Sequence, residues 1–461
     1  MKSKGLQQAR EKMQAEGVDP VAIEVFAHYY RQIEHGETGL IPENTIEPLD
    51  SPALASVEVG DQAAAEAVAA TVVIKLNGGL GTSMGMERAK SLLCVRRGLS
   101  FLDVIARQVL HLRKEYDVTL PVIFMNSFRT SSDTLTALAR YEDLAVEGLP
   151  LDFLQNKEPK LRTDDLMPVS WPRDPSLEWC PPGHGDLYTA LKGTGLLDRL
   201  IDAGYRYAFV SNSDNLGAVP DARVAGWFAG SGAPFAIEAV RRTPSDRKGG
   251  HFARRRSDGR IVLRETAQTA DADKEALADL DRHKFTSTNN LWFDLERMRS
   301  ELQRRDGILG LPLIRNKKTV DPGDSSTPEV IQIETAMGAA IEVFEDSTTI
   351  EVGRDRFVPV KTTNDLLVLR SDAYDLRKDF VLDQVAESLP FVDLDPHYKR
   401  VDDFDKRFPA GVPSLREAES LVVSGDWTFG RDVRVKGRAK LEGDHGRVDA
   451  GTVLGEAPAS E

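Results

Sequence analysis

The residues best suited to phosphate chemistry follow a short apolar segment that ends at Leu76. This segment runs into "NGGLGT", which ends at Thr82, and Lys90 follows a few residues later. Glycines tolerate positive φ and let backbone N–H groups approach a ligand, so three of them can form an anion-binding nest. The spacing matches neither a Walker A loop nor a GxGxxG fingerprint. The glycines fit a tight strand-to-helix turn equally well, and it is the ammonium of Lys90 that favours phosphate.

A histidine framed by glycines is the second candidate. His184 lies in "CPPGHGD", where two prolines stiffen the entry. A histidine so placed has an exposed ring that can bond a phosphate or act as an acid or base. The alternative is a structural histidine.

Polar residues that close an apolar run form the third candidate. "FVSNSDNLGA" places Asn212, Asp214 and Asn215 directly after a predicted strand. Mg²⁺ prefers one or two carboxylates together with substrate phosphates, so Asp214 suits a magnesium site. An Asx-turn or a helix cap is the alternative, because Asp and Asn favour both.

Three further segments carry polar residues that could complete such a site. "STNNLWF" offers Asn289 and Asn290, whose amides suit sugar hydroxyls, or form a turn. "IETAMGAAIEVF" offers Glu334, which could accept hydrogen bonds from hydroxyls or cap a helix. "FVPVKTTNDLL" offers Lys361, for phosphate or as a surface lysine. A phosphate nest, two lysines and a magnesium-type Asp suit phosphoryl or nucleotidyl transfer, where catalysis is mostly positioning and charge neutralisation.

The elements that position these residues alternate between strand and helix. Strands are predicted at 71–76, 120–127, 151–156 and 206–215, and helices at 100–116, 132–141 and 186–204. Ser100 and Asp103 predict a capping box at the start of the first of these helices. The rhythm indicates a mostly parallel sheet covered by helices, with ligands at the carboxyl ends of its strands.

The two ends of the chain differ from this middle. Residues 21–36 have apolar positions near a helical period. Near the C-terminus, apolar pairs recur every six residues, at Trp427/Phe429, Val433/Val435 and Ala439/Leu441. Such a period with turn glycines predicts a small β-helix, and a β-meander is the alternative.

Composition excludes several classes of protein. The chain has 461 residues and a net charge of −14, which argues against general nucleic-acid binding. Two cysteines make no disulfide framework or zinc cluster and fit a reducing compartment. An apolar signal region and a run of about 18 apolar residues are both missing from the sequence, so neither secretion nor a membrane span is expected.

At these motifs the sequence resembles the eukaryotic-type UTP–glucose-1-phosphate uridylyltransferases. "LNGGLGTSMG", "PPGHGD", "SNSDNLGA", "TNNLW", "ETAMGAAI" and "PVKTTNDLLV" occur in that order, and the likeness runs from about Leu40 to Val453. The resemblance implies a Rossmann-like (GT-A-like) α/β nucleotidyltransferase fold with a mostly parallel sheet and a C-terminal left-handed β-helix. It places a helical region at 1–60, the catalytic domain at 61–370 and the C-terminal domain at 371–461, with the β-helix at about 415–455.

The resemblance also implies the reaction and the roles of the residues. UTP and glucose 1-phosphate would give UDP-glucose and pyrophosphate reversibly, with Mg²⁺, in the cytoplasm. The implied nucleotide-binding residues are Leu76, Gly78, Gly79, Gly81, Thr82, Gln155 and Gly183. The implied sugar-phosphate residues are His184, Asn212, Asn290 and Glu334, the metal ligand is Asp214, and the catalytic lysines are Lys90 and Lys361.

Two departures from the family pattern bear on specificity and assembly. The family commonly has Asn where Ser287 stands. This leaves open a broader UDP-sugar pyrophosphorylase, and a silent UDP-sugar-binding protein is a further alternative. The sequence also stops soon after "GTVLGE". Animal relatives continue with a strand that helps to build an octamer, so a monomer or small homo-oligomer is expected instead.

Overall fold

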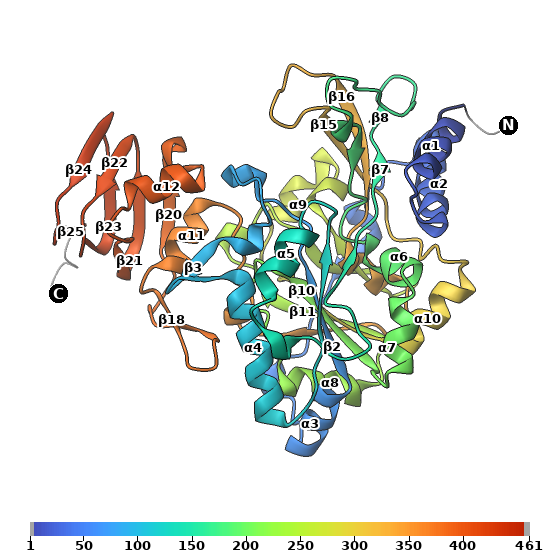
Figure 1. Ribbon diagram of the computed structural model, residues 1–461, viewed down its shortest axis with the longest axis horizontal. Helices are drawn as coiled ribbons and strands as arrows, with labels where there is room; N and C mark the ends of the chain where they lie inside the picture. Colours follow the sequence, from blue (N-terminus) through green and yellow to red (C-terminus); the bar gives the residue numbers. More distant parts are fainter. Residues whose placement is uncertain (1–3, 456–461) are drawn as a thin grey trace.

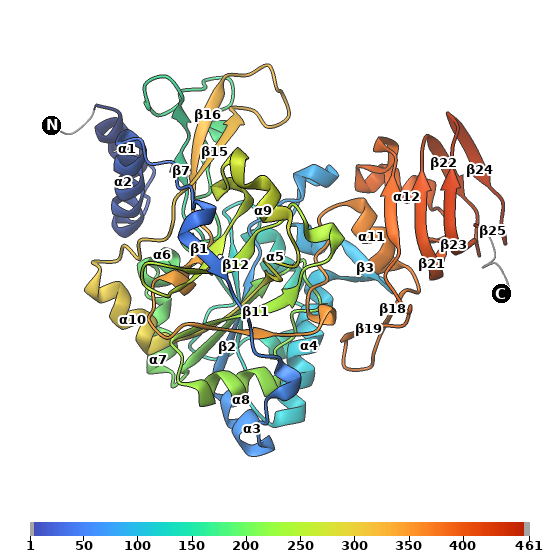
Figure 2. The ribbon, with the colours of Figure 1, turned by 180° about the vertical axis from the view of Figure 1, so that it is seen from behind.

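The computed structural model describes residues 4–455. Its middle is a seven-stranded sheet with helices on both faces (Figure 1). A helical pair near the N-terminus lies at one end of the molecule, and a stack of C-terminal strands lies at the other (Figure 2). Within the described residues, no helix combines the length and the apolar character that a bilayer crossing needs.

The central sheet contains the strands that the sequence predicted. In spatial order they are β17 (Thr348–Glu351), β11 (Phe235–Arg241), β14 (Phe285–Asp294), β10 (Tyr207–Asn212), β2 (Thr71–Leu76), β5 (Val122–Asn126) and β6 (Asp152–Leu154). β10, β2, β5 and β6 run parallel, as do β11 and β17, and β14 runs antiparallel to both of its neighbours. The predicted mixed α/β fold with a parallel-rich sheet is confirmed.

β2 lies in the middle of this sheet and is buried on both faces. Val72 and Ile74 pack into the core on one face, and Val73 packs into the core on the other. A strand covered on both sides needs apolar residues at successive positions, which explains the run before Leu76. Leu76 pairs with Asn212 of β10 and with Met125 of β5, so three carboxyl ends meet at one edge.

Helices of two groups cover the sheet. One core includes residues of α3 (Asp61–Ala69), α4 (Phe101–Tyr116) and α8 (Ala222–Ser231), and the other includes residues of α6 (Asp186–Gly193), α7 (Leu196–Asp202) and α10 (Leu295–Arg304). α5 (Ser131–Leu138) contacts α4. The predicted capping box of Ser100 and Asp103 is confirmed. The single helix predicted at 186–204 is wrong, because Gly195, with φ 68°, breaks it into α6 and α7.

Smaller layers flank the sheet. α1 (Lys4–Ala15) and α2 (Pro20–Glu34) pack on a three-stranded sheet of β15 (Ile314–Thr319), β16 (Glu329–Glu334) and β8 (Leu161–Arg162). A second small sheet joins β1 (Ile46–Pro48), β12 (His251–Arg255) and β13 (Ile261–Arg264), near α9 (Lys274–Ala278). Two short pairs are β3 (Cys94–Arg96) with β4 (Leu99–Ser100) and β7 (Glu158–Pro159) with β9 (Trp179–Cys180).

The C-terminal part begins with α11 (Thr363–Arg370) and the pair β18 (Tyr374–Leu376) and β19 (Leu382–Gln384). α12 (Val401–Arg407) then precedes most of the strands, which are β20 (Phe391–Leu394), β21 (Ser414–Val423), β22 (Asp426–Phe429), β23 (Arg434–Leu441), β24 (His445–Val448) and β25 (Val453–Leu454). β20, β21, β23 and β25 pair in parallel, and so do β22 and β24. A meander of sequential antiparallel strands, the alternative from the sequence, does not describe this part.

Candidate active site

A cavity of about 290 Å³ lies at the carboxyl ends of the central strands. Most of the residues that the sequence singled out surround it. They come from the ends of β2 and β10, from the glycine stretch and from the loop before α6. The cavity is lined by Leu76, Gly78, Gly79, Lys90, Met125, Gln155, Pro181, Gly183, His184, Asn212, Ser213 and Asp214.

The glycine stretch is shaped by close contacts rather than by a helix that follows it. A side chain on Gly78 would begin 2.7 Å from Oε1 of Gln155, so a Cβ here would displace the amide of Gln155 from this backbone. Gly81 adopts φ 66°, in the left-handed region, and opens a short 3₁₀ turn, Thr82–Met84. The backbone N–H of Lys90 bonds the carbonyl of Gly79 at 3.0 Å, which folds this lysine back over the stretch.

Lys90 and Asp214 form an ion pair at one wall of the cavity. Nζ of Lys90 lies 2.6 Å from Oδ2 of Asp214, and the two side chains are 16% and 24% exposed. The same ammonium also donates to the carbonyl oxygen of Val360. The cation and the carboxylate that the sequence assigned to phosphate and to metal therefore hold each other in this structure.

His184 is held as a neutral ring. Gly183, with φ 78°, brings the backbone so close to Thr335 that a side chain would begin 2.6 Å from its carbonyl oxygen. The N–H of Met337 donates to Nδ1 of His184 at 2.9 Å. Because Nδ1 accepts this bond, the ring carries its proton on Nε2. The ring is exposed, and because protonating Nδ1 would break the bond from Met337, this geometry favours a neutral ring that donates through Nε2–H.

Comparison with known proteins gives a consistent answer. Residues 23–436 match the family model of UTP–glucose-1-phosphate uridylyltransferase. The chain belongs to this family. A probable UTP–glucose-1-phosphate uridylyltransferase of Schizosaccharomyces pombe is 38% identical, covering 83% of this chain and 75% of its own length. The barley (Hordeum vulgare) enzyme of that name is also 38% identical, over 83% and 80%.

Solved structures of family members extend the match to the whole fold. A UDP-glucose phosphorylase from Trypanosoma brucei is 43% identical, with a TM-score of 0.91 over 98% of both chains. A variant of UDP-glucose pyrophosphorylase from Leishmania major in complex with UDP-glucose is 43% identical, with a TM-score of 0.92 over 100% of both chains. The resemblance drawn from the sequence motifs is confirmed.

Five of the residues predicted for the uridylyltransferase site do not line the cavity. Glu334 lies next to it, because a side chain on Gly183 would begin 3.1 Å from its Cβ. Lys361 is exposed and follows Val360, the residue that Lys90 contacts. Gly81 lies against Lys90, with 3.2 Å between the position of a Cβ and Cγ of the lysine. Thr82 is exposed in the turn that follows.

Asn290 lies behind the cavity and is 0% exposed. Its amide donates to Oε2 of Glu238 at 2.9 Å and to the carbonyl of Arg356 at 3.3 Å. Asn289, beside it, has φ 58° and is partly exposed. The left-handed turn at Asn289 decides which amide of the pair faces inward, and the sequence gives no sign of that turn.

A buried polar network behind the cavity was missed from the sequence. Glu238 forms a bidentate pair with Arg356, with both contacts at 2.6 Å, and accepts from Nε1 of Trp292 at 3.0 Å. Lys75 of β2, 1% exposed, donates to Oγ of Ser211 and to the carbonyl of Ala218. Burial lowers the pKa of Lys75 to about 7. The sequence did show one charged residue inside each of two apolar strands, Lys75 in β2 and Glu238 in β11. A charged residue in such a strand needs a buried partner.

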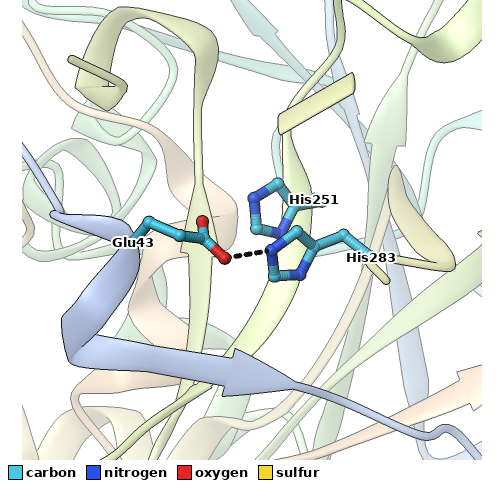
Figure 3. A group of neighbouring side chains, drawn as sticks. All are labelled: Glu43, His251 and His283. Atoms are coloured by element: carbon cyan, nitrogen blue, oxygen red, sulfur yellow. Dashed lines mark hydrogen bonds and ion pairs between the residues drawn. The ribbon is translucent and has the colours of Figure 1, made fainter. Parts of the chain in front are cut away.

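A second group of ligand-type side chains lies outside the cavity, on the small β12 layer (Figure 3). Nε2 of His283 lies 2.9 Å from Oε1 of Glu43, and the rings of His251 and His283 stack with centroids 3.7 Å apart. The ligand atoms of the three residues lie within 4.8 Å of one another.

The geometry of this group argues against a metal centre. A ring nitrogen coordinates in the plane of its ring, and stacked rings tilted by only 20° do not point at one ion. Both oxygens of Glu43 are also occupied, by Arg282 at 2.7 Å and by Arg264 at 2.5 Å. A cation would meet these two guanidinium groups. We interpret the group as a structural network that holds the segment before β1 against Arg264 at the end of β13 and against His283 just before β14.

A hollow of about 830 Å³ near residues 37–45 is larger than the cavity at the strand ends. Four arginines line it, and each is already ion-paired: Arg255, Arg256, Arg260 and Arg305. Size alone therefore does not locate the chemistry of this uridylyltransferase-family chain. The smaller cavity gathers the groups suited to phosphate, metal and sugar, and we place the candidate active site there.

Proposed function

We propose that the protein transfers the uridylyl group of UTP to glucose 1-phosphate reversibly, giving UDP-glucose and pyrophosphate. An oxygen of the sugar phosphate attacks the α-phosphorus of UTP in line. The new P–O bond forms as the bond to the bridging oxygen breaks, and pyrophosphate leaves with that electron pair. The observation that carries the proposal is the match over the full chain to a family member in complex with UDP-glucose. The cavity with Lys90, Asp214 and His184 supplies the chemistry.

The uridine is proposed to lie over the glycine stretch. Gly78 and Gly79 line the cavity with bare backbone that a flat base can approach, and Leu76 lines it beside them. Gln155 packs against Gly78 and offers an amide for the edge of the uracil ring. Gly183, which also lines the cavity, is proposed to lie by the base.

Lys90 is proposed to bind the phosphates, next to Gly81 and Thr82. In the structure its ammonium is paired with Asp214, so binding the triphosphate requires Lys90 to exchange this carboxylate for phosphate oxygens. The exchange preserves a charge-assisted hydrogen bond for the ammonium.

Asp214 is the proposed ligand of Mg²⁺. Among the residues that the structure describes, it is the sole carboxylate lining the cavity, which fits an ion that takes its other oxygens from phosphates and water. Bound there, Mg²⁺ would neutralise phosphate charge. The carboxylate becomes available as Lys90 leaves it.

The sugar phosphate is proposed to lie toward His184 and Asn212, which line the cavity. The Nε2–H of His184 donates to a phosphate oxygen without bringing charge. Glu334, beside Gly183, accepts from sugar hydroxyls. The amide of Asn290, the other residue predicted for the sugar, is bonded to Glu238 and to Arg356 in this structure. Lys361, exposed and next to Val360, is proposed to neutralise charge on the phosphates as they meet.

A broader UDP-sugar pyrophosphorylase is the second candidate, favoured by Ser287. Its hydroxyl accepts from the N–H of Asn289 at 3.0 Å, where the family pattern has an amide. The loss of one polar contact would weaken discrimination against other sugar 1-phosphates. Rates with galactose 1-phosphate and glucose 1-phosphate distinguish the two candidates.

The direct test is release of pyrophosphate from UTP and glucose 1-phosphate. The purified protein should release it with Mg²⁺ present and stop when EDTA is added. UDP-glucose binding without any pyrophosphate release would instead indicate a silent binding protein. A matrix of UTP, TTP, ATP and GTP against several sugar 1-phosphates then defines the substrates.

We also propose that the C-terminal strands form a left-handed β-helix. Their parallel pairing joins Ser420 to Arg438, and Asp426 to His445, which are spacings of about three six-residue steps. We also propose that the chain is divided into a helical region at 1–60, a catalytic domain at 61–370 and a C-terminal domain at 371–461. The proposed assembly is a monomer or a small homo-oligomer. A cytoplasmic location is supported by the free thiols of Cys94 and Cys180.

A further inference from the structure

The segment that carries Lys361 is joined to the loop that carries Asp214 through one buried side chain. Asn215, 1% exposed, follows Asp214 directly. Its Oδ1 accepts from the N–H of Val358 at 2.8 Å. Its Nδ2 donates to the carbonyl of Arg356 at 3.1 Å. A single amide thus binds one donor and one acceptor on the chain just before Lys361.

Backbone contacts around this amide fix the same register. The N–H of Val360 bonds the carbonyl of Asp214 at 3.2 Å, and Asn215 forms a bridge with Pro359. Gly217 lies so close to the other segment that a side chain on it would begin 2.2 Å from the carbonyl oxygen of Asp355. The two segments are therefore packed without space between them.

The far side of the joint is anchored in the core of the sheet. Arg356 is held by both oxygens of Glu238, which is 0% exposed on β11. Nδ2 of Asn215 also lies 3.4 Å from Oδ1 of Asn290, whose amide binds Glu238. The segment before Lys361 cannot shift along the sheet without breaking buried hydrogen bonds, each costly to leave unmade.

We propose that Asn215 is a positioning residue that sets Lys361 relative to Asp214 for the transfer step. The inference rests on the roles given to Lys361 and Asp214 in the proposed function. Asn215 touches no substrate in this proposal and acts through Lys361. Charge neutralisation depends steeply on placement, since a displacement of about 1 Å can lower a rate about 100-fold.

A double-mutant cycle tests this coupling. Asn215→Ala should lower kcat about tenfold or more with the KM for UTP changed by less than about threefold. In a Lys361→Ala background the same substitution should lower kcat by less than about twofold, because the lysine that it displaces is gone. Equal losses in both backgrounds, or no loss in the first, would overturn the proposal.

Gln108→Ala is the matched control. Gln108 is 2% exposed and its amide also holds this loop, through the carbonyl of Leu216, but it joins the loop to Phe380 instead. It should lower stability without lowering kcat by more than about twofold. A kcat loss equal to that of Asn215→Ala would mean that any disturbance of the loop suffices.

Two further measurements keep the test independent of folding and of activity. If Asn215→Ala does not fold, Gly217→Ala replaces it, because the added methyl group pushes the same two segments apart. Its loss of kcat should also fall below about twofold in the Lys361→Ala background. Hydrogen exchange of the peptide spanning 356–360 should speed up in Asn215→Ala and remain unchanged in Gln108→Ala. Unchanged hydrogen exchange in Asn215→Ala would contradict the proposal that Asn215 holds the segment before Lys361. An inactive wild-type protein would contradict only the proposed function.

Discussion

Two clusters of similar chemistry have opposite surroundings. In the cavity, Asp214 faces the ammonium of Lys90, which in the proposed function would exchange this carboxylate for phosphate oxygens. Near β12, Glu43 faces His283 and two guanidinium groups, one of them on Arg264, which is 0% exposed. The first cluster borders open space, and the second is closed by its own salt bridges. A carboxylate paired with a cationic side chain can serve as a ligand site when a ligand can replace one partner. When further salt bridges hold both partners, the pair stabilises the fold instead.

The largest expected effect is on kcat, and it comes from replacing Lys361, which is proposed to act beside the Lys90–Asp214 cluster. Lys361→Ala should lower kcat by about 10²-fold or more, because the role proposed for this charge is exerted mainly in the transition state. The side chain is exposed, so thermal stability should not change. Initial rates of pyrophosphate release measure the effect. The control is Lys378→Ala, on the exposed turn between β18 and β19, and equal kcat values for the two variants would show that the role is misassigned.

Removing the carboxylate of the closed cluster should affect stability instead. Glu43→Gln leaves Arg264 with Asp273 as its remaining carboxylate, at 2.8 Å. We expect a loss of about 2 kcal/mol in the free energy of unfolding, with kcat unchanged. Urea unfolding measures it. The matched control is Glu47→Gln, whose exposed pair with Arg256 should contribute less than about 1 kcal/mol. A kcat defect in Glu43→Gln would show that the two clusters are coupled.

The stacked histidines make the closed cluster sensitive to acid. Burial, then His283 and the nearby Arg242 and Arg264, lower the pKa of His251 to about 3. The unfolded chain takes up this proton near pH 6.5, so the contribution of His251 to stability is present above that pH and lost as the pH falls toward 3. His251→Phe should therefore narrow the stability difference between pH 7 and pH 5. No narrowing in His251→Phe would contradict the assignment.

The smallest expected effect concerns pH and His184. Because protonating Nδ1 would break its hydrogen bond from the N–H of Met337, this ring should not take up a proton during turnover. His184→Gln keeps a side-chain N–H donor, so it should reduce kcat/KM without changing the shape of its pH profile. An inflection near pH 6.5 that disappears in the variant would show that His184 works as an acid or base.

The sequence was most informative where local patterns decide structure. The apolar run of β2, the capping box of α4 and the polar strand ends could be predicted, because each depends on burial or on neighbours in the chain. The position of Asn290 could not, since it depends on one left-handed residue at 289. Nor could the partners of Glu238 and Lys75, which come from distant strands. The charges inside these strands were visible, but what they bind is decided by tertiary packing.

The parallel pairing of the C-terminal strands has a consequence for how this protein family changes length. Arg434 pairs with Val453 and Asp426 pairs with His445, each 19 residues further along, and Leu421 pairs with Ala439, 18 residues further along. If the chain loses or gains one whole interval, the next strand can still pair with a strand of the same orientation and the same apolar pattern. Losing half of one turns apolar side chains to the wrong side. Among relatives, insertions and deletions in this part should therefore come in whole intervals, while the sequence between β2 and α11 keeps its length at the cavity.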